Sequence, residues 1–244
     1  MVGDPIVVDV WHLSFEHLKG VGVPLSVCLS NPEKERAARF VLERDRCRFI
    51  VCRGLLRAVL ATRLRVTPTE VVFHYGEKGK PDLEGSPLFF NLSHSRDRAC
   101  IAVCHEAALG VDVEYVRAPT RHSWIDLAQR FFSTIEIAQL AALPTSRQLE
   151  GFFACWTRKE AYLKLHGLGL SLPLNQFSVT VDPDTPAILC SAEWRPEDVN
   201  RISLHDLPAP RQYRSSLAIA SPAPVTLNHI HISSLRSFPF FHQV

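Results

Sequence analysis

Apolar residues recur at helical spacing in the segment 152–166, FFACWTRKEAYLKLH. Phe152 and Trp156 stand one turn apart, and no Gly or Pro interrupts the pattern before Gly167. Gly167 predicts the end of this helix, and Pro173 predicts an extended chain beyond it. The sequence therefore predicts a helix that begins at Phe152 and ends at Gly167.

One stripe of this helix combines a large aromatic side chain with two opposite charges. Trp156, Glu160 and Lys164 stand four residues apart and so share one face. The stripe can be a surface ion pair, which contributes about 0.3–0.5 kcal/mol. It can also be the charged edge of a core helix, or half of a site in which Glu160 binds a metal ion and Lys164 binds a phosphate. The helix alone leaves these three interpretations open.

Strand and helix patterns follow one another along the rest of the chain. A capping Ser or Asn before Pro32 predicts one helix start, and Ser133 predicts another. We expect strands at 6–13, 71–75, 88–92, 99–104, 109–116, 177–181, 188–194 and 216–220. We expect helices at 33–42, at 44–64, at 123–132, from 134 onward, and at 152–166.

The strand 109–116 departs from its own apolar pattern. Because strand side chains alternate between the two faces, Asp112 and Glu114 share one face and two valines take the other. With Glu160, these acids would supply carboxylate oxygens to one hard cation such as magnesium. The alternative is a solvent-facing strand whose acids never meet Glu160. We expect this strand to form a hairpin with 99–104.

Two short polar stretches are further candidates for chemistry. Ser93-His94-Ser95 has no GxSxG elbow, so it suits donation to a phosphate oxygen better than nucleophilic attack. Gly79-Lys80-Pro81 offers a close backbone approach and one cation, which suits a phosphate or a purine ring. A capping or buried polar role and a solvated turn are the respective alternatives.

Composition narrows the function classes. The 244 residues are 46% hydrophobic and 21% charged, which fits one large or two small globular domains. A net charge of +2 gives no global field for nucleic acid or membrane, although arginines crowd 36–65. No apolar run reaches the roughly 18 residues of a membrane span. The seven cysteines match no zinc pattern and the start lacks a signal-peptide pattern, so we expect reduced thiols in a cytoplasmic protein.

The two halves of the chain echo each other. The segments FIVCRGLLRAVL and FACWTRKEAYLK both predict a helix bearing arginine or lysine, followed by a loop and a strand. This echo predicts two similar lobes that face each other.

The chain resembles the 4′-phosphopantetheinyl transferases of the long, surfactin-synthetase-activator type in a series of motifs: PEKERAARF, DRCRFIVCRGLLR, GKP, FNLSHS, GVDVE, RFFSTIE and WTRKEAYLKLHGLGLSLPL. The similarity runs from Trp11 to about Val181. It implies an α+β fold, a pseudo-twofold monomer of two similar lobes, each a small antiparallel sheet packed with helices, with the active site in the cleft between them. We place the lobe for the coenzyme A nucleotide at 1–108 and the lobe for the metal and the carrier protein at 109–244.

The resemblance also implies a reaction and the residues that carry it. The family moves the phosphopantetheine arm of coenzyme A onto a serine of an acyl, peptidyl or aryl carrier protein and releases adenosine 3′,5′-bisphosphate. By resemblance, magnesium (or alternatively manganese) binds Asp112, Glu114 and Glu160. The positions that match the family's coenzyme A contacts are Arg48, Arg53, Lys80, Pro81, Ser93, His94 and Lys164, the last of them at the pyrophosphate. Lys34 and Arg36 lie where the family places further cations, offset by about one residue.

The acceptor of the serine proton stays open among three acids. The candidates are Glu160, Glu114 through a water, and Glu136. A carboxylate bound to magnesium is a poor base, because the cation favours its ionised form. The acid that binds the metal least directly is therefore the preferred base. We expect Trp156 and Lys159 to fix the helix against the cleft rather than to act chemically.

Two other function classes compete with the enzyme. A non-enzymatic coenzyme A or carrier-protein binding module would be expected to have lost an acid or Lys164, and all are present. A nucleic-acid binder built on the arginine-rich segment would show salt-sensitive binding, and the near-neutral net charge argues against it. We therefore predict a monomeric transferase that binds coenzyme A and carrier proteins, with the carrier docking near 120–150.

Overall fold

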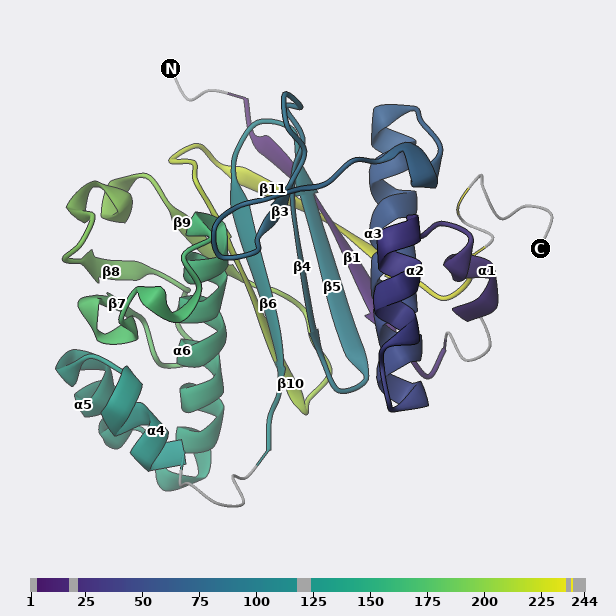
Figure 1. Ribbon diagram of the computed structural model, residues 1–244. Coiled ribbons are helices and arrows are strands. Elements are labelled where there is room, and N and C mark those ends of the chain that lie inside the picture. The colour runs from purple at the N-terminus through teal and green to yellow at the C-terminus, as the bar shows by residue number, and fades with distance from the viewer. Residues whose placement is uncertain (1–3, 18–21, 118–123, 236–237, 239–244) are drawn as a thin grey trace.

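The computed structural model describes residues 4–17, 22–117, 124–235 and 238 (Figure 1). This part of the chain contains six α-helices and eleven β-strands, and nearly all strand pairs are antiparallel. The predicted α+β class is confirmed. Every helix in the described ranges is too short or too polar to span a lipid bilayer.

The helices follow the predicted order, with different ends. They are α1 (Gly22–Ser26), α2 (Asn31–Ala38), α3 (Glu43–Leu64), α4 (Trp124–Phe131), α5 (Thr134–Ala142) and α6 (Thr145–His166), with 3-10 turns at Pro68–Glu70, Gly169–Ser171, Leu174–Gln176 and Pro196–Asn200. The caps before α2 and α5 are present as predicted. Ser123, the predicted first residue of the fourth helix, lies outside the described residues.

Helix α6 ends where the sequence predicts and begins earlier. Gly167 closes it with φ of 69°, a left-handed conformation that glycine adopts without steric cost. The helix starts at Thr145 instead of Phe152. Gly151 therefore lies inside the helix. A Cβ at this position would stand 2.5 Å from Leu143 Cδ1, which leaves little room for any residue larger than glycine. Close packing, and not a break in the helix, explains this glycine.

The strands form two central sheets and two small ones. They are β1 (Ile6–Ser14), β2 (His74–Tyr75), β3 (Pro81–Asp82), β4 (Phe89–Ser95), β5 (Arg98–Cys104), β6 (Leu109–Tyr115), β7 (Phe177–Val179), β8 (Leu189–Ala192), β9 (Ser203–Asp206), β10 (Tyr213–Ile219) and β11 (Val225–Ile232). One central sheet has the order β11-β1-β5-β4 and the other β6-β10-β9. The pairs β2-β3 and β7-β8 stand apart.

The predicted hairpin between 99–104 and 109–116 is wrong. Strand β5 pairs with β1 along one edge and with β4 along the other, so neither edge is left for β6. Strand β6 pairs with β10 instead, and the chain passes from one sheet to the other between Cys104 and Leu109. The last strand, β11, returns to pair in parallel with β1. The division at 108/109 therefore stays a prediction, with one late strand in the first sheet.

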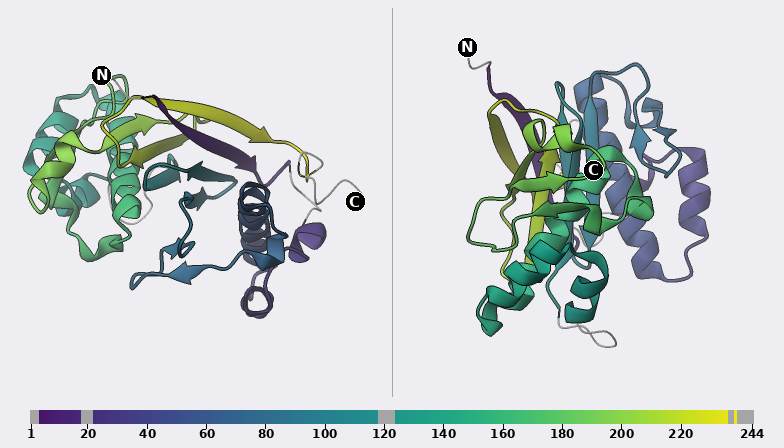
Figure 2. Two further views of the ribbon diagram at one scale, coloured as in Figure 1. Left: turned by 90° about the horizontal axis from the view of Figure 1, so that it is seen from above. Right: turned by 90° about the vertical axis from the view of Figure 1, so that its left-hand side faces the viewer.

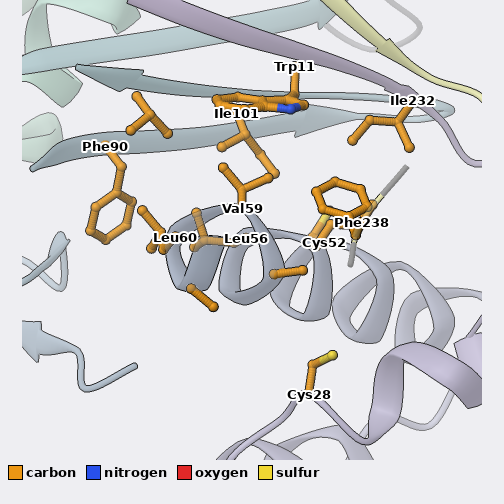
Figure 3. Close-up of a cluster of buried hydrophobic side chains, with 14 of the residues drawn as sticks. Trp11, Cys28, Cys52, Leu56, Val59, Leu60, Phe90, Ile101, Ile232 and Phe238 are labelled. Atoms are coloured by element: carbon orange, nitrogen blue, oxygen red, sulfur yellow. The ribbon is translucent and has the colours of Figure 1, made fainter. Parts of the chain in front are cut away.

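Each central sheet packs one long helix, as the sequence echo predicts. Helix α3 lies on one side of the strands and α6 on the other (Figures 1 and 2). Leu56, Val59 and Leu60 of α3 point toward Trp11 and Ile101 of the sheet (Figure 3). A second core surrounds α6, and a third fills the space behind the junction of the two sheets. These cores fix α3 and α6 relative to the strands between them.

Gly110 sets the distance between α6 and β6. A Cβ at this position would lie 2.2 Å from Ala161 O and 2.2 Å from Leu165 N. Any larger residue would push the helix away from the strand. Glycine therefore allows α6 to bring its charged stripe against the acids of β6.

Candidate active site

A cavity of about 420 Å³ opens between α3, β4 and the turn that leads to β3. Of the predicted coenzyme A contacts, Arg48, Arg53, Pro81 and His94 line it, and so does Arg36. Phe40, Phe49 and Leu92 supply apolar surface. Burial, then the charges of Lys164 and Arg48, lowers the pKa of His94. The cavity is thus basic at one side and apolar at the other, which suits an anionic nucleotide.

Arg53 and Arg57 are held by one buried acid. Glu33 Oε1 accepts from Arg53 Nε at 2.6 Å, and Glu33 Oε2 accepts from Arg57 Nε at 2.5 Å. Arg53 also donates to the Tyr75 hydroxyl. Hydrogen bonds from both guanidinium groups lower the pKa of Glu33 against the opposing effect of its burial. Arg53 is therefore fixed at the cavity wall, while Arg57 is structural.

Lys80 points away from this cavity. Its Nζ donates to Leu109 O at 3.1 Å and to Leu165 O at 2.8 Å, and burial lowers its pKa to about 8. It thereby joins the turn before β3 to β6 and to the end of α6. Its neighbour Pro81 lines the cavity. The motif GKP thus places one residue at the cavity and uses the other as a bridge.

The predicted acids and lysine meet where β4, β6 and α6 come together. Lys164 Nζ lies 2.6 Å from Asp112 Oδ1 and donates to Ser93 Oγ at 2.8 Å. Ser93 Oγ donates to the same Asp112 oxygen at 2.8 Å. Of the three interpretations of the α6 stripe, a surface ion pair between Glu160 and Lys164 is not supported, because Lys164 pairs with the buried Asp112 of β6 instead.

Glu114 and Glu160 crowd the same place. Burial, followed by the charge of Asp112, raises the pKa of Glu114 although Ser95 Oγ donates to it at 2.7 Å. Burial and the charges of Asp112 and Glu114 raise the pKa of Glu160 to about 7, and Lys164 opposes this shift. The charge of Asp112 therefore disfavours the ionisation of both glutamates.

The chemistry of this cluster fits a divalent cation. Asp112 Oδ2 is buried and has no hydrogen-bond partner, which is costly unless something else satisfies it. A cation would satisfy that oxygen and reduce the repulsion between the acids. Across the described ranges, no three His, Cys, Asp or Glu side chains are arranged to enclose a metal ion by themselves. The predicted ligands Asp112, Glu114 and Glu160 therefore do not form a ready three-carboxylate site, whereas magnesium usually takes only one or two protein carboxylates and completes its shell with water and phosphate.

Glu136, the third candidate base, lies elsewhere. Its side chain is fully buried, and Oε1 lies 2.7 Å from Lys159 Nζ. Its carboxylate also accepts from Ser133 N and Val179 N. These contacts leave Glu136 away from the acid cluster and argue against it as the base. Lys159 has a packing role, but it holds α6 to α5 and β7 rather than to the cleft, and Trp156 packs on Phe152 and neighbouring aromatic rings.

The sequence patterns did not indicate two residues that position the site, Gly110 and Asn91, and they suggested phosphate binding for a third, Ser95. Gly110 allows the close approach of α6, Asn91 accepts from Val111 N at 3.0 Å, and Ser95 holds Glu114. The signals were present: the glycine opens GVDVE, and the polar residues alternate in FNLSHS. Lys34 is exposed and does not line the cavity.

Several known proteins with similar sequences are 4′-phosphopantetheinyl transferases. The chain is 39% identical over 189 residues to the 4′-phosphopantetheinyl transferase HetI of Nostoc sp., which covers 76% of this chain and 78% of that protein. It is 34% identical over 156 residues to the transferase Sfp of Bacillus subtilis, covering 63% of this chain and 67% of that protein. For AcpT of Salmonella typhi the identity is 37% over 172 residues, covering 70% and 76%.

Two family models match adjoining parts of the chain. The model described as 4′-phosphopantetheinyl transferase, N-terminal, matches residues 23–106. The model of the 4′-phosphopantetheinyl transferase superfamily matches residues 108–226. The first match contains the arginine-lined cavity and the second contains the acids and Lys164. The chain is a transferase enzyme and belongs to the 4′-phosphopantetheinyl transferase superfamily.

Proposed function

We propose that the arginine-lined cavity and the acid cluster form one site, which moves the 4′-phosphopantetheine arm of coenzyme A to a serine of an apo acyl or peptidyl carrier protein. The observation that carries this proposal is the partnerless, buried oxygen of Asp112 beside Lys164. It lies at the junction of β4, β6 and α6, and the other face of β4 lines the basic cavity. A substrate with a nucleotide at one end and a pyrophosphate in the middle matches this order.

The cavity binds the nucleotide end of coenzyme A. Arg48 and Arg53 supply fixed positive charge for phosphate, and His94 supplies a ring N–H from β4. Pro81 and the phenylalanines supply apolar contact for the base. Lys80 contributes by holding this wall against the second sheet.

Asp112, with Glu114 or Glu160 beside it, would hold a magnesium or manganese ion through its partnerless oxygen. When bound, the ion neutralises charge on the pyrophosphate, which is the main requirement of phosphoryl transfer. Lys164 supplies a second positive charge at the same phosphates. Ser93 keeps Lys164 and Asp112 together, because its hydroxyl contacts both.

The chain's own groups then direct the transfer. The serine oxygen of the carrier forms a bond to phosphorus, and the phosphoanhydride bond breaks to release adenosine 3′,5′-bisphosphate. The serine proton passes to Glu160 or to Glu114, whichever binds the metal less directly, since ligation lowers basicity. Arg48 and Lys164 hold the phosphates of the leaving adenosine 3′,5′-bisphosphate in place. Both halves of the site come from one chain, which supports a monomer.

A mass-shift assay tests this function. Purified protein, coenzyme A and magnesium are incubated with a panel of apo carrier proteins from fatty acid, polyketide and nonribosomal peptide synthesis. We expect intact mass spectrometry to show addition of one phosphopantetheine to at least one carrier, and no addition with excess EDTA. Folded protein that binds coenzyme A and modifies no carrier would overturn the proposal in favour of a binding module.

A further inference from the structure

Strands β4 and β6 meet without a shared backbone ladder. They belong to different sheets, and β6 uses its other edge to pair with β10. Alternate side chains of β4 accept the free N–H groups of β6 instead. The three bonds run from Val111 N to Asn91 Oδ1 (3.0 Å), from Val113 N to Ser93 Oγ (3.3 Å) and from Tyr115 N to Ser95 Oγ (3.2 Å).

Two of these three bonds are coupled to the acids. Ser93 Oγ accepts from Val113 N and donates to Asp112 at 2.8 Å. Ser95 Oγ accepts from Tyr115 N and donates to Glu114 at 2.7 Å. A hydroxyl can donate only one hydrogen bond, and each of these serines donates it to one carboxylate. The strand register therefore determines where the two acids stand.

Glu114 depends on Ser95 more than Asp112 depends on Ser93. Asp112 also contacts Lys164, but among the described residues only Ser95 donates a hydrogen bond to the carboxylate of Glu114. The strand end that carries Ser95 is itself anchored. The adjacent Asp97 accepts from Ser14 Oγ at 2.9 Å and donates its N–H to the Tyr213 hydroxyl at 3.3 Å.

The opposite face of β4 serves the nucleotide cavity. Leu92 and His94 line that cavity. They alternate along the strand with Asn91, Ser93 and Ser95, which bond to β6. One strand thus separates the two functions of the site. Ser93 and Ser95 contact the acids, and Leu92 and His94 line the cavity proposed for the nucleotide.

We infer that Ser95 is a positioning residue of this transferase, which holds the Glu114 carboxylate in place through its hydroxyl while the other face of β4 binds the nucleotide. The inference rests on the proposed function. It predicts that the two faces of β4 affect different kinetic constants. Partners that orient metal ligands typically change metal affinity or activity by about 10–100-fold when removed.

The test compares Ser95→Ala, Ser95→Thr and His94→Ala with the wild-type protein. For Ser95→Ala we expect kcat to fall by about tenfold and the Kd for Mn²⁺, measured by electron paramagnetic resonance without coenzyme A, to rise by about tenfold. Its KM for coenzyme A should change by less than about twofold, because that contact is on the other face of the strand. Ser95→Thr keeps the hydroxyl and should restore both kcat and Mn²⁺ binding. His94→Ala should instead raise the KM for coenzyme A and leave Mn²⁺ binding unchanged.

Two controls separate positioning from loss of structure. Asn91→Ala removes a bond between β4 and β6 that contacts no acid, so it should lower the Tm and weaken Mn²⁺ binding less than Ser95→Ala does. Ser203→Ala removes a hydroxyl that bonds His205 in β9 and should change neither quantity. Unchanged Mn²⁺ binding in Ser95→Ala, or failure of threonine to restore it, would overturn the inference while an active wild type upholds the proposed function. A wild type that transfers nothing would overturn both.

Discussion

Helix α6 carries two lysine–carboxylate pairs that look alike by distance and differ in everything else. Lys159 Nζ lies 2.7 Å from Glu136, and Lys164 Nζ lies 2.6 Å from Asp112. Both partners of the first pair are fully buried, and Lys159 also donates to two backbone carbonyls. In the second pair the lysine side chain is 29% exposed, and one buried Asp112 oxygen has no partner.

The difference lies in unused capacity. Each oxygen of Glu136 is satisfied by Lys159 or by a backbone N–H, so nothing else can bind there. Asp112 keeps one oxygen free and stands beside two further acids whose pKa values are raised. A satisfied buried pair stabilises a fold, and an unsatisfied one with like charges around it is prepared for a ligand.

Breaking the satisfied pair Lys159–Glu136, called the closed pair below, should have the largest effect on stability. Lys159→Met leaves the Glu136 charge buried without its partner and should lower the free energy of unfolding by about 3–5 kcal/mol, measured by urea denaturation. The double variant Lys159→Met/Glu136→Gln should recover part of that loss. Lys34→Met, at an exposed position on α2, should be neutral. Equal stability of the Lys159 variant and the wild type would show that the pair is not structural.

Breaking the pair Lys164–Asp112, called the open pair because one Asp112 oxygen has no partner, should reduce activity and leave the fold intact. Asp112→Asn should reduce transfer to a carrier protein by at least about 100-fold, because a charge that acts in the transition state is lost. The free energy of unfolding should change by less than about 1.5 kcal/mol, since Lys164 can hydrate when its partner is removed. Asp184→Asn, at an exposed ion pair with Arg147, is the matched control. A large loss of stability would make Asp112 part of the closed class.

Changing Gly110 should disturb only the open pair. Gly110→Ala forces α6 from β6 and should lower the free energy of unfolding by about 1–3 kcal/mol. Transfer should fall more than stability alone explains, because Lys164 moves relative to Asp112. Gly76→Ala has ordinary space around its Cβ, with Lys80 O at 3.8 Å, and should cost little. Wild-type transfer by Gly110→Ala would mean that this contact does not set the site.

A histidine cluster remote from both pairs should give the smallest effect. His12 Nε2 lies 3.0 Å from His229 Nδ1, and burial, then the charges of His229 and His231, lowers the pKa of His12 to about 4. The unfolded chain therefore binds this proton near pH 6.5 and the folded chain only near pH 4. Stability should fall as the pH drops between these values, by about 1–2 kcal/mol once the full difference in pKa is discounted for the solvent that screens this half-buried ring.

Thermal unfolding at several pH values checks this expectation. His12→Gln removes the titrating group and should flatten the dependence between pH 6.5 and 4. Neither lysine pair contains a histidine, so their variants should retain the wild-type slope. A slope that survives in His12→Gln would assign the effect to other groups.

The sequence indicated many residues of the candidate site, and the structure shows that they lie in two groups, one at the cavity and one at the acid cluster. Arg48, Arg53, Pro81 and His94, which the family resemblance gives as coenzyme A contacts, line one cavity. Lys80 donates to two backbone carbonyls, which no pattern around it indicates. The sequence could not predict this, because the two acceptors are 29 and 85 residues away.

Pairing was the other part that the sequence left open. The apolar run of β5 suited a hairpin with β6, but both edges of β5 were taken by β1 and β4. Competition for a strand edge depends on segments far away in the chain, one of which pairs with β5 from Val8 onward. A local pattern contains no information about that competition.

The sequence by itself determined the elements whose causes are local. The caps of α2 and α5, the end of α6 at Gly167 and the shared face of Asp112 and Glu114 all depend on contacts within one or two turns or on strand alternation. Only the tertiary structure decided which carboxylate each lysine meets. Lys164 reaches Asp112 across 52 residues, and Lys159 reaches Glu136 from the other side of the same helix. Burial and partner count are set by packing, and they separate the structural pair from the candidate catalytic one.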